Sequence, residues 1–157
     1  MNIGIIVYSL SGHSVSVASE LKEKLSASGH SVVMERIETV GPASSANEQV
    51  DLKTRPAIEK YDALVFGFPV RGGAIPPPMV SYLEGIPSLR NKKVHSFVTH
   101  FFRKEWGANQ TNTAFKAICE AKGAQICYMG EINWFNLNRK KIVLQVIDQI
   151  MESITNC

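Results

Sequence analysis

The sequence predicts an α/β fold, a three-layer α-β-α sandwich around a five-stranded parallel sheet in the order 2-1-3-4-5. Short apolar runs alternate along the chain with segments of helical periodicity, and this alternation indicates helical crossovers between parallel strands. The 157 residues are 45% hydrophobic and 20% charged, enough to bury the core that such a sheet requires. We therefore expect a single domain over residues 1–157.

The first half of the sequence contains three predicted strands and one predicted helix. The strands are short apolar runs, typical of parallel strands covered on both faces. They cover residues 3–8, 30–37 and 61–70. The helix begins near Ser14 and ends at Gly29, because apolar residues recur at helical spacing between them. Residues 38–60 are polar and interrupted by glycine and proline, so we expect a long excursion with at most one short helix.

The second half alternates helices and strands more regularly. A helix should begin at Pro77 or Pro78, since proline suits the first helical turn, and end near Gly85. Two further strands are expected, at residues 92–101 and 124–132. Two further helices are expected, at Ala114–Lys122 and Asn138–Ile154.

This topology predicts where a ligand binds. In open parallel sheets, ligands occupy the edge formed by the carboxyl ends of the strands, at the point where the strand order reverses. Here that point lies between the first and third strands. The loops to examine are therefore residues 9–14, 68–77 and 99–108.

The first of these loops, "SLSGHS", is rich in hydroxyl groups and opens onto a helix N-terminus, which is an anion site because its backbone N–H groups are unpaired. G-x-G-x-x-G and G-x-x-x-x-G-K-[ST] are both absent, which argues against a dinucleotide and against a nucleoside triphosphate. The serines could donate to a phosphate monoester instead. The alternative is that Ser11 or Ser14 simply caps the helix.

The segment "YSLSGHS" resembles the phosphate-binding loop of flavodoxins, which follows the pattern strand–[ST]-x-[ST]-G-x-[ST]–helix. The resemblance extends to "GFPVRGGAIPPPMVSYL" after the third strand and to "KKVHSFVTHF" with the tryptophan–glycine pair that follows it. It implies a flavodoxin-like domain that binds FMN without a covalent bond. It also implies that the phosphate is held by Ser9, Ser11, Gly12, His13 and Ser14.

The other two loops are expected to hold the flavin ring. The second would offer backbone groups from Pro69, Val70, Arg71, Gly72 and Gly73. It has no aromatic residue between Phe68 and Tyr82, unlike many flavodoxins, so stacking would fall to the third loop. That loop offers Thr99, His100, Phe101, Phe102, Trp106 and Gly107. Alternatively, Phe101 or Phe102 completes the apolar core.

The charge balance is basic, with a net charge of +3 and a pI of about 8.8, whereas flavodoxins that carry electrons are typically acidic. Our hypothesis is that the Arg71 guanidinium stabilises the reduced, anionic flavin; the alternative is a solvated surface arginine. Arg139, Lys140 and Lys141 form either a patch for an acidic partner or an unremarkable helix start.

Two functions follow from the resemblance. One is an electron carrier, which needs no catalytic side chain, and the other is an NAD(P)H-dependent quinone or flavin reductase; the sequence favours the carrier. A third possibility is a domain of the same fold that binds no flavin. We expect no metal, and the histidines are isolated, with His95 interpreted as structural.

The expected partner is a redox protein or a small quinone or nicotinamide substrate, with no nucleic acid and no membrane. Association into a homodimer is left open. The cysteines lack C-x-x-C spacing, so we expect two buried thiols and one free thiol at the tail, as in a cytoplasmic protein. These cysteines are Cys119, Cys127 and Cys157.

Overall fold

Five parallel strands form one sheet in the order β2-β1-β3-β4-β5, which confirms the predicted fold class. The computed structural model describes residues 1–41, 50–101 and 107–157. The strands are β1 (Asn2–Val7), β2 (Ser31–Arg36), β3 (Ala63–Pro69), β4 (Lys93–His100) and β5 (Gln125–Asn133). The helices are α1 (His13–Ala27), α2 (Pro77–Gly85), α3 (Ala108–Ala121) and α4 (Arg139–Asn156).

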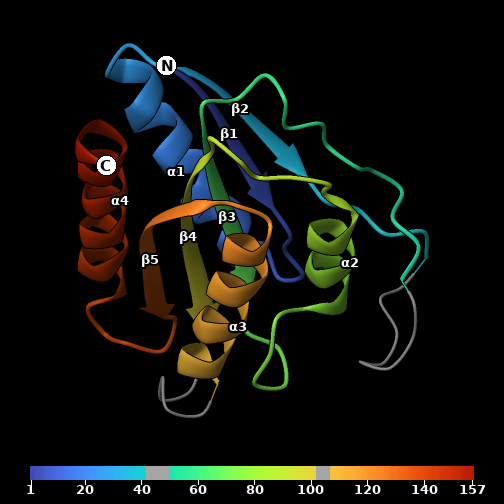
Figure 1. Ribbon diagram of the computed structural model, residues 1–157. Helices are drawn as coiled ribbons and strands as arrows, with labels where there is room; N and C mark the ends of the chain where they lie inside the picture. Colours follow the sequence, from blue (N-terminus) through green and yellow to red (C-terminus); the bar gives the residue numbers. More distant parts are fainter. Residues whose placement is uncertain (42–49, 102–106) are drawn as a thin grey trace.

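The helices form the two outer layers of the sandwich, with α1 and α4 on one face of the sheet and α2 and α3 on the other (Figure 1). Each face has its own apolar core. Residues of β3 alternate between the two cores, so that Phe66 packs toward α3 and Val65 packs toward α1 and α4. Both chain termini lie at the edge of the sheet opposite the carboxyl ends of the strands (Figure 1). The edge at the carboxyl ends is therefore formed by loops.

Helix α3 begins at Ala108, six residues before the predicted start at Ala114. The intervening segment is polar and contains poor helix formers, which is why helical periodicity does not reveal it. Tertiary packing compensates, because Ala108 and Thr111 are both buried in the structure. The helix therefore starts directly after Gly107, at the predicted site.

The long excursion between β2 and β3 packs against α2 and contains no helix in its described part, residues 38–41 and 50–60. Thr39 and Leu52 form an antiparallel bridge, and the Tyr82 hydroxyl of α2 donates to the carbonyl of Pro56 at 2.5 Å. Ile58 is buried in the core beneath α2. None of the described helices is long and apolar enough to span a membrane.

Two cysteines form a disulfide, which corrects the expectation of two buried thiols and a free thiol at the tail. Cys127 of β5 is bonded to Cys157, with Cα atoms 5.9 Å apart, and Cys119 is the buried free thiol. The pairing depends on topology, because α4 packs beside β5 and returns the chain end to the start of that strand. The short C-x-x-C spacing that signals cysteine chemistry in a sequence does not arise from a contact of this kind.

Candidate functional site

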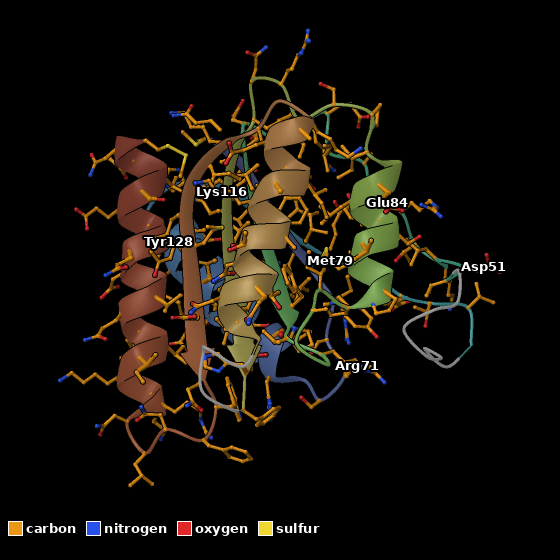
Figure 2. The ribbon with its side chains drawn as sticks, turned by 60° about the horizontal axis from the view of Figure 1, so that its bottom comes forward. Asp51, Arg71, Met79, Glu84, Lys116 and Tyr128 are labelled. Carbon is orange, nitrogen blue, oxygen red and sulfur yellow. A yellow bond between two sulfur atoms is a disulfide. The ribbon has the colours of Figure 1, made fainter. Side chains whose placement is uncertain are left out.

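The predicted site lies where the carboxyl ends of the parallel strands meet. The loops that follow β1, β3 and β4 converge there, and the turn after β5 joins them at the same edge. In Figure 2 this edge is turned forward and carries Arg71, on the turn that follows β3. The sequence predicts the first three loops at this edge but not the turn after β5.

The first loop ends in a helix N-terminus that no side chain caps. Gly12 is the N-cap of α1 and has a left-handed backbone, with φ of +88°. Its N–H donates to Ser9 Oγ at 3.1 Å, which draws the loop into a tight turn. Neither Ser11 nor Ser14 caps the helix, so the N–H groups of its first turn remain available to a ligand.

Ser14 ties the first loop to the third. It is almost fully buried, and its Oγ lies 3.3 Å from Oγ1 of Thr99, the penultimate residue of β4. Ser11, in contrast, is exposed at the tip of the turn. The hydroxyls of Ser9, Ser11 and Ser14 therefore belong to one loop but have different surroundings.

The second loop contains a tight hairpin. The N–H of Arg71 donates to the carbonyl of Ala74 at 3.0 Å, and the N–H of Ala74 donates back at 3.1 Å. Gly72 and Gly73 between them have φ of +57° and +73°, the left-handed pair of a type I′ turn, which only glycine, asparagine or aspartate adopts readily. Both backbone hydrogen bonds of the hairpin therefore join Arg71 to Ala74.

The second and third loops are in direct contact. The N–H of Val70 donates to the carbonyl of Thr99 at 2.8 Å. A Cβ built on Gly107 would lie 2.8 Å from the Cα of Gly73, so a larger residue would push the loops apart. Gly107 therefore serves close packing of the two loops.

Arg71 is exposed and lies on the turn that follows β3 (Figure 2). Its positive charge acts on the phenol of Tyr8, which is 4% exposed. Burial raises the pKa of Tyr8, and the Arg71 charge opposes that rise. Arg71 of the second loop thus interacts electrostatically with Tyr8, directly after β1, and its role toward a reduced flavin stays a prediction.

An aromatic cluster closes the site on the side of β5. The His13 imidazole lies nearly parallel to the Trp134 indole, with ring centroids 4.1 Å apart and planes inclined by 16°. Phe101 lies 5.6 Å from His13 and 4.9 Å from Phe135, again between centroids. Phe101 is half-buried and belongs to neither core cluster, so it does not complete the core as the alternative proposed.

Trp134 is the residue that sequence reasoning missed. It belongs to the turn after β5, and its N–H donates to the carbonyl of His100, the last residue of β4, at 2.7 Å. The available signal was the segment "NWFNLN", two adjacent aromatic residues directly after a strand that ends at the ligand-binding edge. Applying the rule of strand ends to β5 as well as to the other strands would have included it.

Arg139 adds a positive charge beside this cluster. Its Cζ lies 4.7 Å from the centroid of the Trp134 ring, and its guanidinium donates to the Trp134 carbonyl at 2.9 Å. Burial lowers the pKa of His13, and the Arg139 charge lowers it further. His13 Nδ1 is buried and has no hydrogen-bond partner among the described residues.

The structure thus brings together the predicted residues of all three loops. Pro69 ends β3, and Thr99 and His100 end β4, with His100 7% exposed. Phe102 and Trp106, both proposed to stack on a ring, lie outside the described residues. The stacking role assigned to this loop therefore stays a prediction.

The solved structures that are similar to this chain share one fold. No family model matches the sequence, and no curated protein matches it. Among solved structures, a flavodoxin from Streptococcus pneumoniae TIGR4 is similar at a TM-score of 0.74 and 15% identity, with all of both chains covered. Flavodoxin 2 from Bacillus cereus is similar at a TM-score of 0.70 and 23% identity, covering 97% of this chain and 99% of the other. Flavodoxin 1 from the same organism is similar at a TM-score of 0.69 and 14% identity, covering 100% of this chain and 99% of the other. The chain has the flavodoxin-like fold, as the resemblance of its loops implied.

Proposed function

We propose that this chain is an FMN-binding redox protein that transfers electrons through a non-covalently bound flavin. The observation that carries the proposal is the N-terminus of α1, whose first turn has no side-chain cap and follows a loop that contains Ser9 and Ser11. The flavin would supply the electron chemistry, and the protein would bind, orient and tune it. Fold alone does not establish a function, so the proposal depends on this site.

The first loop fits a phosphate monoester. The unpaired N–H groups of a helix N-terminus and the helix dipole both favour an anion. Gly12 has nothing within 4 Å of where its Cβ would be, so the loop presents open space above this turn. Nδ1 of His13, buried without a partner among the described residues, is a further polar atom that a ligand could satisfy.

The second loop fits the polar edge of a planar ring. The hairpin leaves the peptide groups of Gly72 and Gly73 without hydrogen bonds to the described residues. Arg71 stands beside them and offers a cation to the oxygen and nitrogen atoms of a ring edge. The Val70–Thr99 hydrogen bond holds the second loop to the third, so the polar groups of both loops would be in position before a ligand binds.

Comparing FMN with riboflavin tests the proposal, because the two differ only by the phosphate. Titration of the purified protein, followed by flavin fluorescence and the visible spectrum, should give an affinity for FMN about 100-fold higher or more. Two charge-assisted hydrogen bonds to the phosphate, each contributing about 1.5 kcal/mol, correspond to an affinity ratio of this size. Absence of FMN binding would refute the proposal, and equal binding of riboflavin would refute the phosphate site.

An NAD(P)H-dependent quinone or flavin reductase is the second candidate, favoured by the cations Arg71, Arg139 and Lys140, which are exposed at or beside the site. Mixing the FMN-loaded protein with NADPH separates the candidates. Fast bleaching of the flavin band identifies a reductase. Bleaching by dithionite alone identifies a carrier.

A further inference from the structure

A second surface feature lies beside the proposed flavin site, on the turn after β5 and the first turn of α4. Phe135 and Leu137 are 69% and 102% exposed, and they are followed directly by Arg139, Lys140 and Lys141, all exposed. We call these five residues the turn surface. Apolar side chains so fully exposed beside a cluster of cations are typical of a place where another protein binds.

The three cations are placed against local electrostatics. The first turn of a helix disfavours positive charge by about 0.3–1 kcal/mol per residue, and no acidic residue occurs in the first turn of α4. None of the three forms an ion pair with any residue in the described ranges. Local rules are commonly broken at functional sites, and here the result is a cluster of three exposed cations, with Glu20 of α1 lining one hollow beside Arg139 and Lys140.

The turn surface is also hollowed. One hollow of about 400 Å³ lies between α1 and α4, and another of about 510 Å³ lies over the turn itself. Trp134, Arg139 and Lys140 line both of them. A partner side chain could therefore insert beside the cations as well as contact the exposed apolar residues.

Ring contacts connect the turn surface to the proposed flavin site. Phe135 contacts Phe101, which contacts His13 of the first loop, at centroid distances of 4.9 and 5.6 Å. Trp134 stacks on His13 at 4.1 Å. A protein docked on the turn surface would thus lie next to the loops that hold the flavin.

We propose that the turn surface is the docking site for an acidic electron-transfer protein. The inference rests on the proposed function, and charge complementarity selects the partner, since exposed cations attract and orient a negatively charged surface. Phe135 and Leu137 would supply the apolar centre of the interface and Lys140 and Lys141 its charged rim. A nucleotide is a poorer occupant, because the Trp134 ring already carries His13 and Arg139 against it and offers no open stacking platform.

The test is a binding titration with the FMN-loaded protein, using an acidic plant-type [2Fe–2S] ferredoxin as the probe and basic cytochrome c as the counter-probe. Ferredoxin should bind, and its Kd should rise at least about tenfold between roughly 20 mM and 200 mM salt, because exposed charges are screened. The double variant Lys140→Glu and Lys141→Glu should raise the Kd at low salt by about tenfold or more. The single variant Phe135→Ser should also weaken binding, through the apolar contact.

The matched control is the double variant Lys60→Glu and Arg90→Glu. It changes the net charge equally, but Lys60 and Arg90 precede β3 and β4 and so lie toward the opposite edge of the sheet. This control should leave the Kd within about twofold, since distant exposed charges are screened. The proposal is overturned if ferredoxin does not bind, if both double variants behave alike, if cytochrome c binds as tightly, or if NADPH displaces ferredoxin.

Affinity for FMN is measured on the same variants, so that the two proposals fail separately. Intact FMN binding without ferredoxin docking overturns the docking site and leaves the proposed function standing. Failure of the unmodified protein to bind FMN overturns the proposed function, whatever the apoprotein does with ferredoxin.

Discussion

The imidazole of His13 and the indole of Trp134 are stacked at 4.1 Å, so the proposed phosphate loop rests on the turn that follows the last strand. The two residues come from opposite ends of the chain, and the contact exists because α1 and α4 lie on the same face of the sheet. The position of His13 therefore depends on an aromatic residue outside its own loop. This dependence can be measured.

Replacing Trp134 with alanine should weaken FMN binding. An aromatic pair contributes about 0.5–1.5 kcal/mol beyond its buried area, so the Kd should rise roughly 2- to 13-fold. Fluorescence titration of FMN measures the change. Leu137→Ala is the matched control, because Leu137 belongs to the same turn and is fully exposed. An unchanged Kd for Trp134→Ala would show that the stack does not position the loop.

Replacing Ser14 with alanine should weaken FMN binding more strongly. The hydroxyl is buried beside Thr99 and, in our proposal, donates to the phosphate, so its loss should cost about 1.5–3 kcal/mol, or roughly 10- to 150-fold in Kd. Riboflavin affinity should change little, because that ligand has no phosphate. Ser19→Ala, on the same helix but paired only with the Met34 sulfur at 3.9 Å, is the control. Equal losses for FMN and riboflavin would place Ser14 away from the phosphate.

Gly12 and Gly29 offer a matched pair that separates strain from ligand binding. Both have a left-handed backbone, with φ of +88° and +93°, and an added Cβ would meet nothing within 4 Å at either. Alanine at either position should destabilise the fold by about 1–2 kcal/mol, measured by urea unfolding. Only Gly12→Ala should also weaken FMN binding, because Gly29 lies at the far end of α1. Similar FMN affinities for the two variants would contradict the site.

The first loop was predictable because its parts are adjacent in the sequence. An apolar strand, a hydroxyl-rich turn with Gly12 and a periodic helix follow one another, and the parallel topology then places two further loops at the same edge. Trp134 and Arg139 were not assigned to the site, since the stack of Trp134 on His13 and the Arg139 charge beside it depend on how the turn after β5 and the start of α4 pack beside α1. Neither periodicity nor a local motif encodes that packing.

The start of α3 and the disulfide were missed for related reasons. The first six residues of α3 have a polar sequence that favours no helix, and burial of Ala108 and Thr111 holds them in place. The Cys127–Cys157 bond spans 30 residues and depends on the length of α4 matching that of β5. Both are tertiary effects, which a single sequence read locally does not contain.

Reducing the disulfide should lower the free energy of unfolding by about 3.6 kcal/mol, as expected for a crosslink between residues 30 apart. Urea unfolding with and without a phosphine reductant measures the loss. The Cys157→Ser variant is the control, since it should show the lowered stability already and should not respond to the reductant. A response in the variant would trace the effect to something other than this bond.

Thiol counting gives an independent check of the same bond. Burial raises the pKa of the Cys119 thiol to about 12, so the folded protein should contain no thiol that reacts quickly with a disulfide reagent. Denaturation without reductant should expose the Cys119 thiol alone, and denaturation after reduction should expose all three cysteines. Three reactive thiols in the unreduced, denatured protein would contradict the pairing.

His95 should make stability depend on pH in the acidic range. The side chain is fully buried in β4, and its Nδ1 lies 2.6 Å from the Ser153 hydroxyl of α4. Burial, with a smaller contribution from the Lys93 charge, lowers the pKa of His95 to about 4. Between this value and the unfolded pKa of about 6.5, the unfolded chain binds the additional proton, so the free energy of unfolding falls as the pH falls. The contribution is complete above about pH 6.5, and up to about 3 kcal/mol of it is lost by pH 4.

The variant His95→Gln isolates this contribution from that of the carboxylates, which also titrate at acidic pH. Glutamine keeps a polar side chain toward Ser153 but cannot take up a proton in this range. Urea unfolding of both proteins between pH 7 and pH 4.5 should therefore give a shallower loss of stability for the variant, even where its stability at pH 7 is lower. If the two curves run parallel, the imidazole exchanges its proton as freely in the folded chain as in the unfolded one, and its burial between β4 and α4 is wrong.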